Sequence, residues 1–204
     1  IDSLSRVMAL TRDADTLTIG LADGRSLRAR AVVLATGGKS LPKTGSDGLG
    51  YQLAQGLGHH LVATTPALAP LLLESGFHAG LSGVSHRAEA MLLVNGRVDR
   101  RLVGDWLWTH FGASGPLALN LSRHWHRAEL DGMVPEVQLS LCPGDDFEAV
   151  EAWLLEQGRT RPRAQLTTVL GTRLPAALGD TWTRLARVDG DIPLAHLTRD
   201  DRRR

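Results

Sequence analysis

An apolar run that stops abruptly at paired glycines constrains this chain more than any other feature. Residues 31–35 read AVVLA and are followed at once by Thr36, Gly37 and Gly38. A continuous apolar run of this length is typical of a strand that is buried on both faces of a sheet. Glycines directly after such a strand let the backbone approach a bulky ligand where a Cβ atom would collide. The alternative is a tight strand-to-helix connection that binds no ligand.

A short helix is predicted to follow this loop, and a hairpin to precede it. Residues 47–58 read DGLGYQLAQGLG, with leucines spaced so that they share one helical face. Asp47 is the predicted N-cap of this helix and Gly58 its end. Upstream, Asp23-Gly24 is a strong turn signal between the alternating residues 16–22 and the return strand 25–29.

Beyond about residue 60 the chain is predicted to be β-rich and then helical. Asn95-Gly96 predicts a turn between two strands, and Pro116 suits the first turn of a helix. The predicted strands are residues 60–64, 68–74, 86–94, 97–103, 106–111 and 134–141. The predicted helices are residues 116–126, a helix from Phe147 capped by Asp145 or Asp146, 163–170 and 181–188.

These elements predict an α+β protein in three parts. Residues 1–62 form a sheet fragment with a helix, residues 63–143 a compact β unit, and residues 144–204 a small helical unit. The first residue is isoleucine, and the chain enters midway through a sheet. We therefore expect it to be an internal part of a longer protein.

Composition excludes several classes of protein. With 43% apolar and 22% charged residues, the chain resembles an ordinary globular domain. The net charge of +1 gives no general attraction to nucleic acid or anionic membranes, so neither is expected as a partner. The apolar runs are far shorter than the roughly 20 residues that span a bilayer. The single cysteine, Cys142, excludes an internal disulfide, and a cytoplasmic location is expected.

Three segments in order resemble one family. They are ATGGKSLPKTGSDGLGYQLAQGLGH at residues 35–59, PALAPL at 66–71 and THFGASGPLALNLS at 109–122. Together they are similar to the BaiN/RdsA-type NAD(P)/FAD-dependent oxidoreductases, which are YhiN-like bacterial flavoproteins. This resemblance implies the edge of an FAD-binding Rossmann-like domain, plus an insert made of a small β-barrel-like unit and a helical unit. It also implies FAD as cofactor, NADH or NADPH as electron donor and a small-molecule substrate.

The resemblance also implies a cofactor site. Thr36, Gly37 and Gly38 would lie against the FAD and provide main-chain contacts and steric room. The residues expected near the flavin or its substrate side are Lys43, Thr44, Gly45, Asp47 and Gly48. The helix N-terminus at Asp47 could favour partial negative charge on the ligand. The alternative for Asp47 is that its carboxylate only caps the helix.

His110 is the candidate proton donor, because it precedes a Gly-Ala-Ser-Gly-Pro break and histidine titrates near neutral pH. A structural imidazole that satisfies backbone groups is the alternative. His59-His60 and His124-x-His126 lack further ligands at metal-binding spacing, so no metal site is predicted.

The predicted function is therefore an internal segment of an FAD-dependent oxidoreductase. It would transfer hydride between flavin and a nicotinamide or organic substrate, with the insert covering the flavin. Because the pyrophosphate fingerprint is absent, the chain alone is expected to be inactive and to bind FAD weakly or not at all. One alternative is a non-catalytic interaction or ligand-binding module. Another is a nucleotide-binding protein of a different reaction class.

Overall fold

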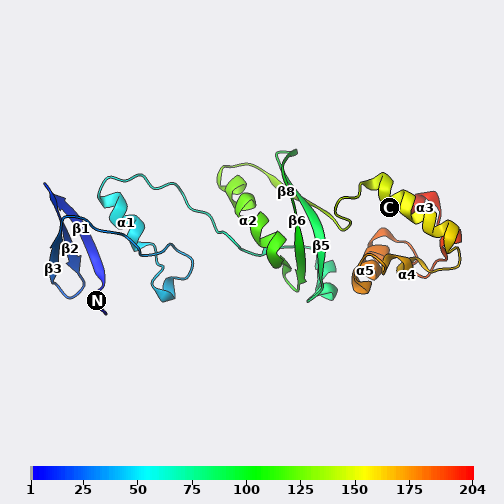
Figure 1. Cartoon of the computed structure of the whole chain (residues 1–204), viewed down its shortest axis with the longest axis horizontal. Coiled ribbons are helices and arrows are strands. Elements are labelled where there is room, and N and C mark those ends of the chain that lie inside the picture. Colours follow the sequence, from blue (N-terminus) through cyan, green and yellow to red (C-terminus); the bar gives the residue numbers. More distant parts are fainter. Residues whose placement is uncertain (1) are drawn as a thin grey trace. The chain divides into compact units, whose positions relative to one another are not determined.

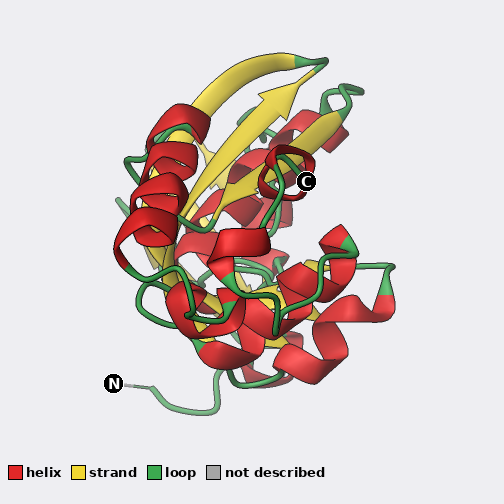
Figure 2. Ribbon diagram, turned by 90° about the vertical axis from the view of Figure 1, so that its right-hand side faces the viewer, coloured by secondary structure: helices red, strands yellow, loops and turns green. Residues whose placement is uncertain are grey.

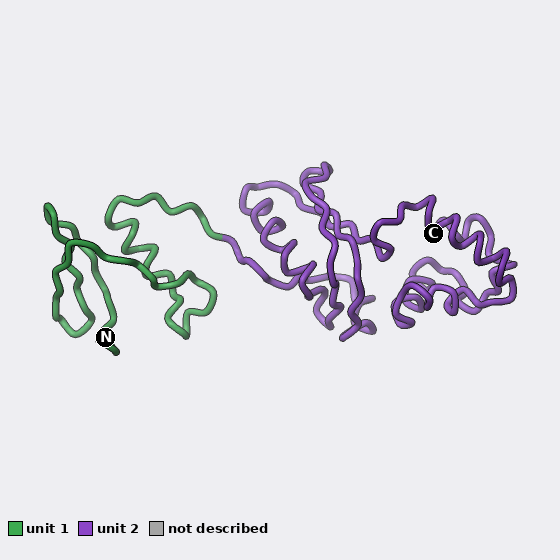
Figure 3. Tube along the Cα trace, viewed as in Figure 1, with its two compact units in different colours: residues 1–64 green, residues 65–204 purple. Residues whose placement is uncertain are grey.

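The chain forms two compact units, which are described separately. The computed structural model describes residues 2–204, and Figure 1 labels their helices and strands. Unit 1 ends at Thr64, and unit 2 runs from Thr65 to Arg204 (Figure 3). The boundary predicted at residue 143, between a β unit and a helical unit, stays a prediction.

Unit 1 carries an antiparallel three-stranded sheet and a short helix. The predicted hairpin is confirmed, with Gly24 in the turn at φ +85°. The sheet has one further strand that the sequence did not predict, and its order is β1-β2-β3. The elements are β1 (Val7–Asp13), β2 (Thr16–Leu21), β3 (Ser26–Ala29), a 3-10 helix (Pro42–Thr44) and α1 (Leu49–Gly56).

The buried strand predicted at residues 31–35 is wrong. These residues have no regular structure, and Val33 is 89% exposed. A strand buried on both faces needs ladder partners and two covering layers. The strands of unit 1 pair only with one another, so none of the described residues supplies either requirement. The run therefore leaves apolar surface uncovered in unit 1.

Unit 2 is built on a curled antiparallel sheet, seen as bending yellow strands in Figure 2. The strand order is β4-β7-β6-β5-β8, so β4 and β8 form the two edges. The predicted Asn95-Gly96 turn joins β5 to β6, and both residues have positive φ. The strands are β4 (Leu71–Leu72), β5 (Ser85–Val94), β6 (Arg97–Thr109), β7 (Gly112–Ser114) and β8 (Pro135–Ser140).

Three strand predictions need correction. Residues 60–64 form no strand, and residues 68–74 contribute only the two residues of β4. Pro70 has no N–H for a ladder, and Leu68 adopts φ +59°. Residues 106–111 are not a separate strand, because Thr109 ends the continuous β6. Gly104 does not break β6. At Gly104 the strand lies against helix α2 (Gly115–Leu130), where an added Cβ would be 3.4 Å from Leu117 Cβ, an ordinary contact.

Helix α2 (Gly115–Leu130) covers the core of unit 2. Pro116 lies in its first turn as predicted. Leu117, Ala118 and Leu121 on α2 are at most 3% exposed and belong to the cluster that the helix forms with the sheet. The buried cluster consists of Leu81, Ala88, Ala90, Leu92, Trp106, Trp108, Ala113, Leu117, Ala118, Leu121 and Leu178.

The C-terminal part of unit 2 is helical, as predicted. Asp146 caps the first of these helices, because its Oδ1 accepts a hydrogen bond of 2.8 Å from the Ala149 N–H. The predicted helix 163–170 is helical only over its last five residues, and the predicted helix 181–188 begins earlier. The helices are α3 (Phe147–Thr160), α4 (Leu166–Leu170), α5 (Ala176–Ala186) and α6 (Arg199–Arg202).

Candidate functional site

The loop predicted to face a cofactor folds back onto the start of α1. A Cβ atom on Gly50 would lie 1.9 Å from Thr36 Oγ1, and one on Gly48 would lie 2.4 Å from Lys39 Cε. Glycine at these positions therefore permits close packing within the loop itself. The predicted residues Thr36, Gly37, Gly38, Lys43, Thr44, Gly45, Asp47 and Gly48 all belong to this one loop.

Asp47 is engaged by the protein. Its Oδ1 accepts a hydrogen bond of 3.0 Å from the Leu49 N–H, and its Oδ2 pairs with Arg6. The pKa of Asp47 is lowered, first by the hydrogen bond from Arg6 and then by the bond from Leu49. The structure assigns the N-cap position to Gly48, so the predicted N-cap is wrong by one residue. The carboxylate nevertheless caps the first turn and stays anionic near neutral pH.

The main-chain donors of Gly37 and Gly38 are available. Within residues 2–204 neither N–H group makes a hydrogen bond. Gly37 adopts φ +71°, which places it in the left-handed region. Two unpaired main-chain donors can bind carbonyl oxygens or ring nitrogens of a ligand.

His110 lies in unit 2, on the turn between β6 and β7. Its imidazole is exposed and meets the ring of Phe111 edge-on at 4.9 Å between centroids. If the imidazole of His110 were structural, it would make hydrogen bonds to backbone groups. Among residues 2–204 it makes none. The side chain is therefore free to meet a ligand. His110 belongs to unit 2 and the predicted cofactor loop belongs to unit 1, so each is described within its own unit.

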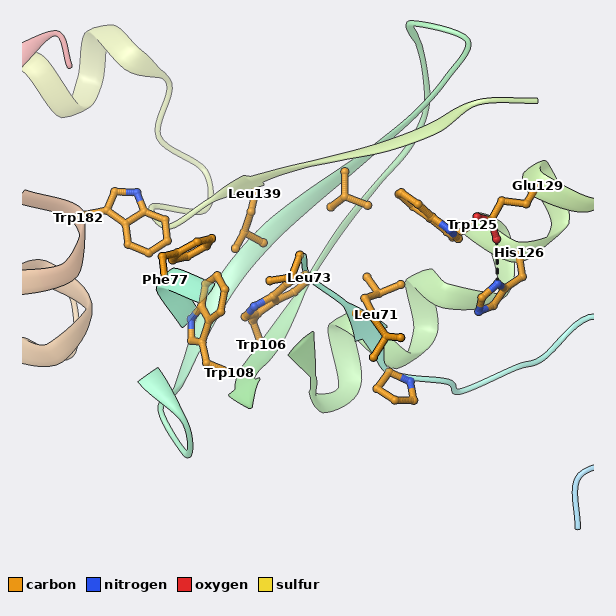
Figure 4. A pocket seen from close by; sticks show the side chains of 13 residues that line it. Leu71, Leu73, Phe77, Trp106, Trp108, Trp125, His126, Glu129, Leu139 and Trp182 are labelled. Carbon is orange, nitrogen blue, oxygen red and sulfur yellow. Dashed lines mark hydrogen bonds and ion pairs between the residues drawn. The ribbon is translucent and has the colours of Figure 1, made fainter. Parts of the chain in front are cut away.

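The sequence did not predict an aromatic cavity of about 560 Å³ (Figure 4). It lies in unit 2, where both edge strands of the sheet contribute to its wall. The signal in the sequence is the Trp106-x-Trp108 alternation on one face of β6. The lining residues are Pro70, Leu71, Leu72, Leu73, Phe77, Trp106, Trp108, Trp125, His126, Glu129, Val137, Leu139 and Trp182.

The two β6 tryptophans differ in how their indole N–H groups are satisfied. Trp108 Nε1 donates to His86 Nε2 over 3.1 Å, and the pKa of His86 is lowered, chiefly because the ring is buried. Trp106 Nε1 is buried without a partner. His86 therefore acts as a neutral acceptor inside the fold. No motif in the sequence distinguishes His86 from the other histidines.

We expect Trp108→Phe to lower the free energy of unfolding by about 1–3 kcal/mol more than Trp106→Phe does. The first change leaves the half-buried His86 nitrogen unpaired, whereas the second removes a donor that has no partner. Both changes delete the same atoms, so the difference between the two losses in the free energy of unfolding reports the hydrogen bond. Chemical denaturation of the two variants measures it, and equal losses would contradict the assignment.

A comparison with known families identifies unit 2. A family model described as "HI0933-like protein barrel and H2TH domain" matches residues 65–204. The chain belongs to the HI0933-like family. The resemblance to BaiN/RdsA-type flavoproteins predicted from the sequence is thereby confirmed, and the curled sheet with its helices agrees with a barrel and H2TH domain.

Curated relatives of this HI0933-like chain carry enzyme names. The chain is 29% identical over 195 residues to a ribosomal RNA dihydrouridine synthase of Escherichia coli, covering 95% of the chain and 45% of the relative. It is 35% identical over 138 residues to a 3-dehydro-bile acid delta(4,6)-reductase of Clostridium scindens, covering 68% and 34%. A ribosomal RNA dihydrouridine synthase of Haemophilus influenzae is 25% identical over 93% of the chain and 44% of the relative. The chain thus spans less than half the length of these relatives. Within residues 2–204, no helix is long and apolar enough to cross a membrane.

Proposed function

We propose that this chain is part of an FAD-dependent reductase in which the loop of residues 36–48 contacts the flavin. The observation that carries the proposal is the pair of unpaired N–H groups on Gly37 and Gly38, in a chain of the HI0933-like family. Unit 2 would cover the flavin and help to enclose the substrate, which excludes water from the reaction.

The loop fits the ring of a flavin and does not fit its pyrophosphate. Free main-chain donors can bind the carbonyl oxygens and ring nitrogens of an isoalloxazine. The only carboxylate of the loop, Asp47, is already paired with Arg6, so the loop presents main-chain donors and not a charged cradle. We therefore assign the flavin ring, and not the pyrophosphate, to this loop.

The relatives' names indicate the class of reaction. One makes dihydrouridine in RNA, and another reduces a bile acid at positions 4 and 6. Each name describes the addition of two hydrogens to a ring double bond. A bound flavin would supply this redox chemistry: NADH or NADPH would reduce it, and the reduced flavin would deliver hydride to the substrate and return to FAD. His110 would donate the proton that the second carbon requires, since its exposed ring makes no hydrogen bond within residues 2–204.

The absorbance spectrum of the whole protein, purified without added cofactor, tests this proposal. We expect a flavin spectrum that bleaches on adding NADH or NADPH. Gly37→Ala should lose most of the flavin, because the new Cβ would lie 3.1 Å from Ser46 Oγ in a left-handed backbone. Gly24→Ala is the matched control, since φ is +85° there and the space is open.

Two results would count against the proposal. A colourless, folded whole protein that takes up no FAD would overturn the cofactor assignment and favour a non-catalytic module. Equal flavin content in the two glycine variants would show that the loop does not contact the cofactor. His110→Gln should keep the flavin and slow substrate reduction, with a changed pH profile.

A further inference from the structure

Two arginines of unit 2 converge on one histidine nitrogen. Arg100 on β6 places Nη1 3.1 Å from His124 Nε2, and Arg123 on α2 places Nε 3.1 Å from the same atom. Arg100 reaches α2 from the same face of β6 as Gly104, which passes close to Leu117. Strand and helix packing therefore fixes where the two guanidinium groups meet.

The histidine between them must be neutral. Guanidinium groups only donate hydrogen bonds, so His124 Nε2 is an acceptor for both, and the ring proton lies on Nδ1. The pKa of His124 is lowered by burial first, and then by the charges of Arg100 and Arg123. The imidazole thus holds the arginines in place without adding a third positive charge.

This cluster has more positive charge than negative charge. Arg100 Nε lies 2.6 Å from Asp99 Oδ2. Arg123, by contrast, has no carboxylate within 4.0 Å among residues 2–204. Arg123 is exposed, and the Arg100 side chain retains 38% of its accessible surface. The pair therefore has one charge without a counterion, at a position that solvent and ligands can reach.

The unused donors suit an oxyanion. Each guanidinium has five N–H donors in a planar fork. Arg100 uses two of them on Asp99 and His124, and Arg123 uses one on His124. The remaining donors match the oxygens of a phosphate, which arginine forks bind through paired, charge-assisted hydrogen bonds.

We propose that Arg100 and Arg123, held by His124, bind a backbone phosphate of an RNA substrate. This inference rests on the proposed reductase function, and the name of one relative supports the choice of RNA as the substrate. The cluster is open to solvent, and none of its three side chains lines the aromatic cavity. An open pair of forks fits a phosphate on a polymer strand. A free phosphate ester is instead usually enclosed by its site.

Binding of the 204-residue chain to a fluorescein-labelled single-stranded RNA, measured by anisotropy at several salt concentrations, tests the proposal. Arg123→Gln should weaken binding about fivefold. It should also make the dependence of log K on log salt less steep by about 0.7, as expected when one phosphate contact is lost. Arg163→Gln removes the same charge from another exposed arginine and should change affinity less than about twofold. Equal effects of the two changes, or no RNA binding by the wild-type chain, would overturn the proposal.

Inorganic phosphate separates the two sources of the same chemistry. Inorganic phosphate is added to the RNA-binding assay as an inhibitor. If Arg123→Gln abolishes inhibition of RNA binding by phosphate but leaves the RNA affinity unchanged, the site binds a free phosphate ester and the RNA proposal is wrong. The anisotropy needs no flavin. A colourless whole protein with an intact RNA site would therefore refute the proposed function alone, and a flavoprotein without the RNA effect would refute this site alone.

Discussion

Replacing Gly112 with alanine is expected to lower the free energy of unfolding of unit 2 by about 3 kcal/mol or more. The new Cβ would lie 2.3 Å from the carbonyl oxygen of Leu71 and 2.8 Å from the backbone nitrogen of Leu73. These are backbone atoms of the segment that pairs with β7, so no side-chain rotation relieves the clash. Gly112 also adopts φ +146°, which a side chain disfavours.

Tryptophan fluorescence during urea denaturation measures this effect in one unit only. All five tryptophans lie between residues 106 and 182, so the signal reports unit 2. Gly132→Ala is the control, because φ is +73° there and no atom lies within 4 Å of the new Cβ. It should cost about 1–2 kcal/mol from backbone strain alone. Similar losses for the two variants would show that β4 and β7 are not packed as described.

Leu121→Ala should destabilise unit 2 by about 3 kcal/mol. Leu121 is fully buried in the cluster between α2 and the sheet, so truncation leaves a cavity as well as losing apolar contacts. Leu130→Ala on the same helix is the control, since Leu130 is 50% exposed and should cost less than about 1 kcal/mol. The same fluorescence experiment compares them. A loss from Leu130→Ala as large as that from Leu121→Ala would contradict the orientation of α2.

Local signals predicted much of unit 2. The Asn95-Gly96 turn, Pro116 at the start of α2 and Asp146 at the cap of α3 are all confirmed, because each depends on neighbouring residues alone. Strand limits failed where they depend on distant partners. The sequence predicted two strands, 97–103 and 106–111, where the structure has the single strand β6, because β6 pairs with β5 from Arg97 to Leu107.

The candidate site was predicted only in part. The glycine loop at residues 36–48 could be read from its composition, but its flavin contacts and the role of His110 stay predictions. The aromatic cavity and the His124 cluster were missed, because both join segments that are distant in the chain. Arg100 and His124 are 24 residues apart, and only the packing of β6 against α2 brings them together.

The two edges of the curled sheet differ in how readily another strand could add to them. β4 is only two residues long and offers almost no template. β8 is longer, but Pro135 has no N–H to donate, and the charged side chain of Glu136 is exposed. Within this sheet, pairing with another copy of the chain is therefore limited to the last residues of β8. Replacing Pro135 would restore an N–H donor at the start of this edge and extend the stretch that another strand could join.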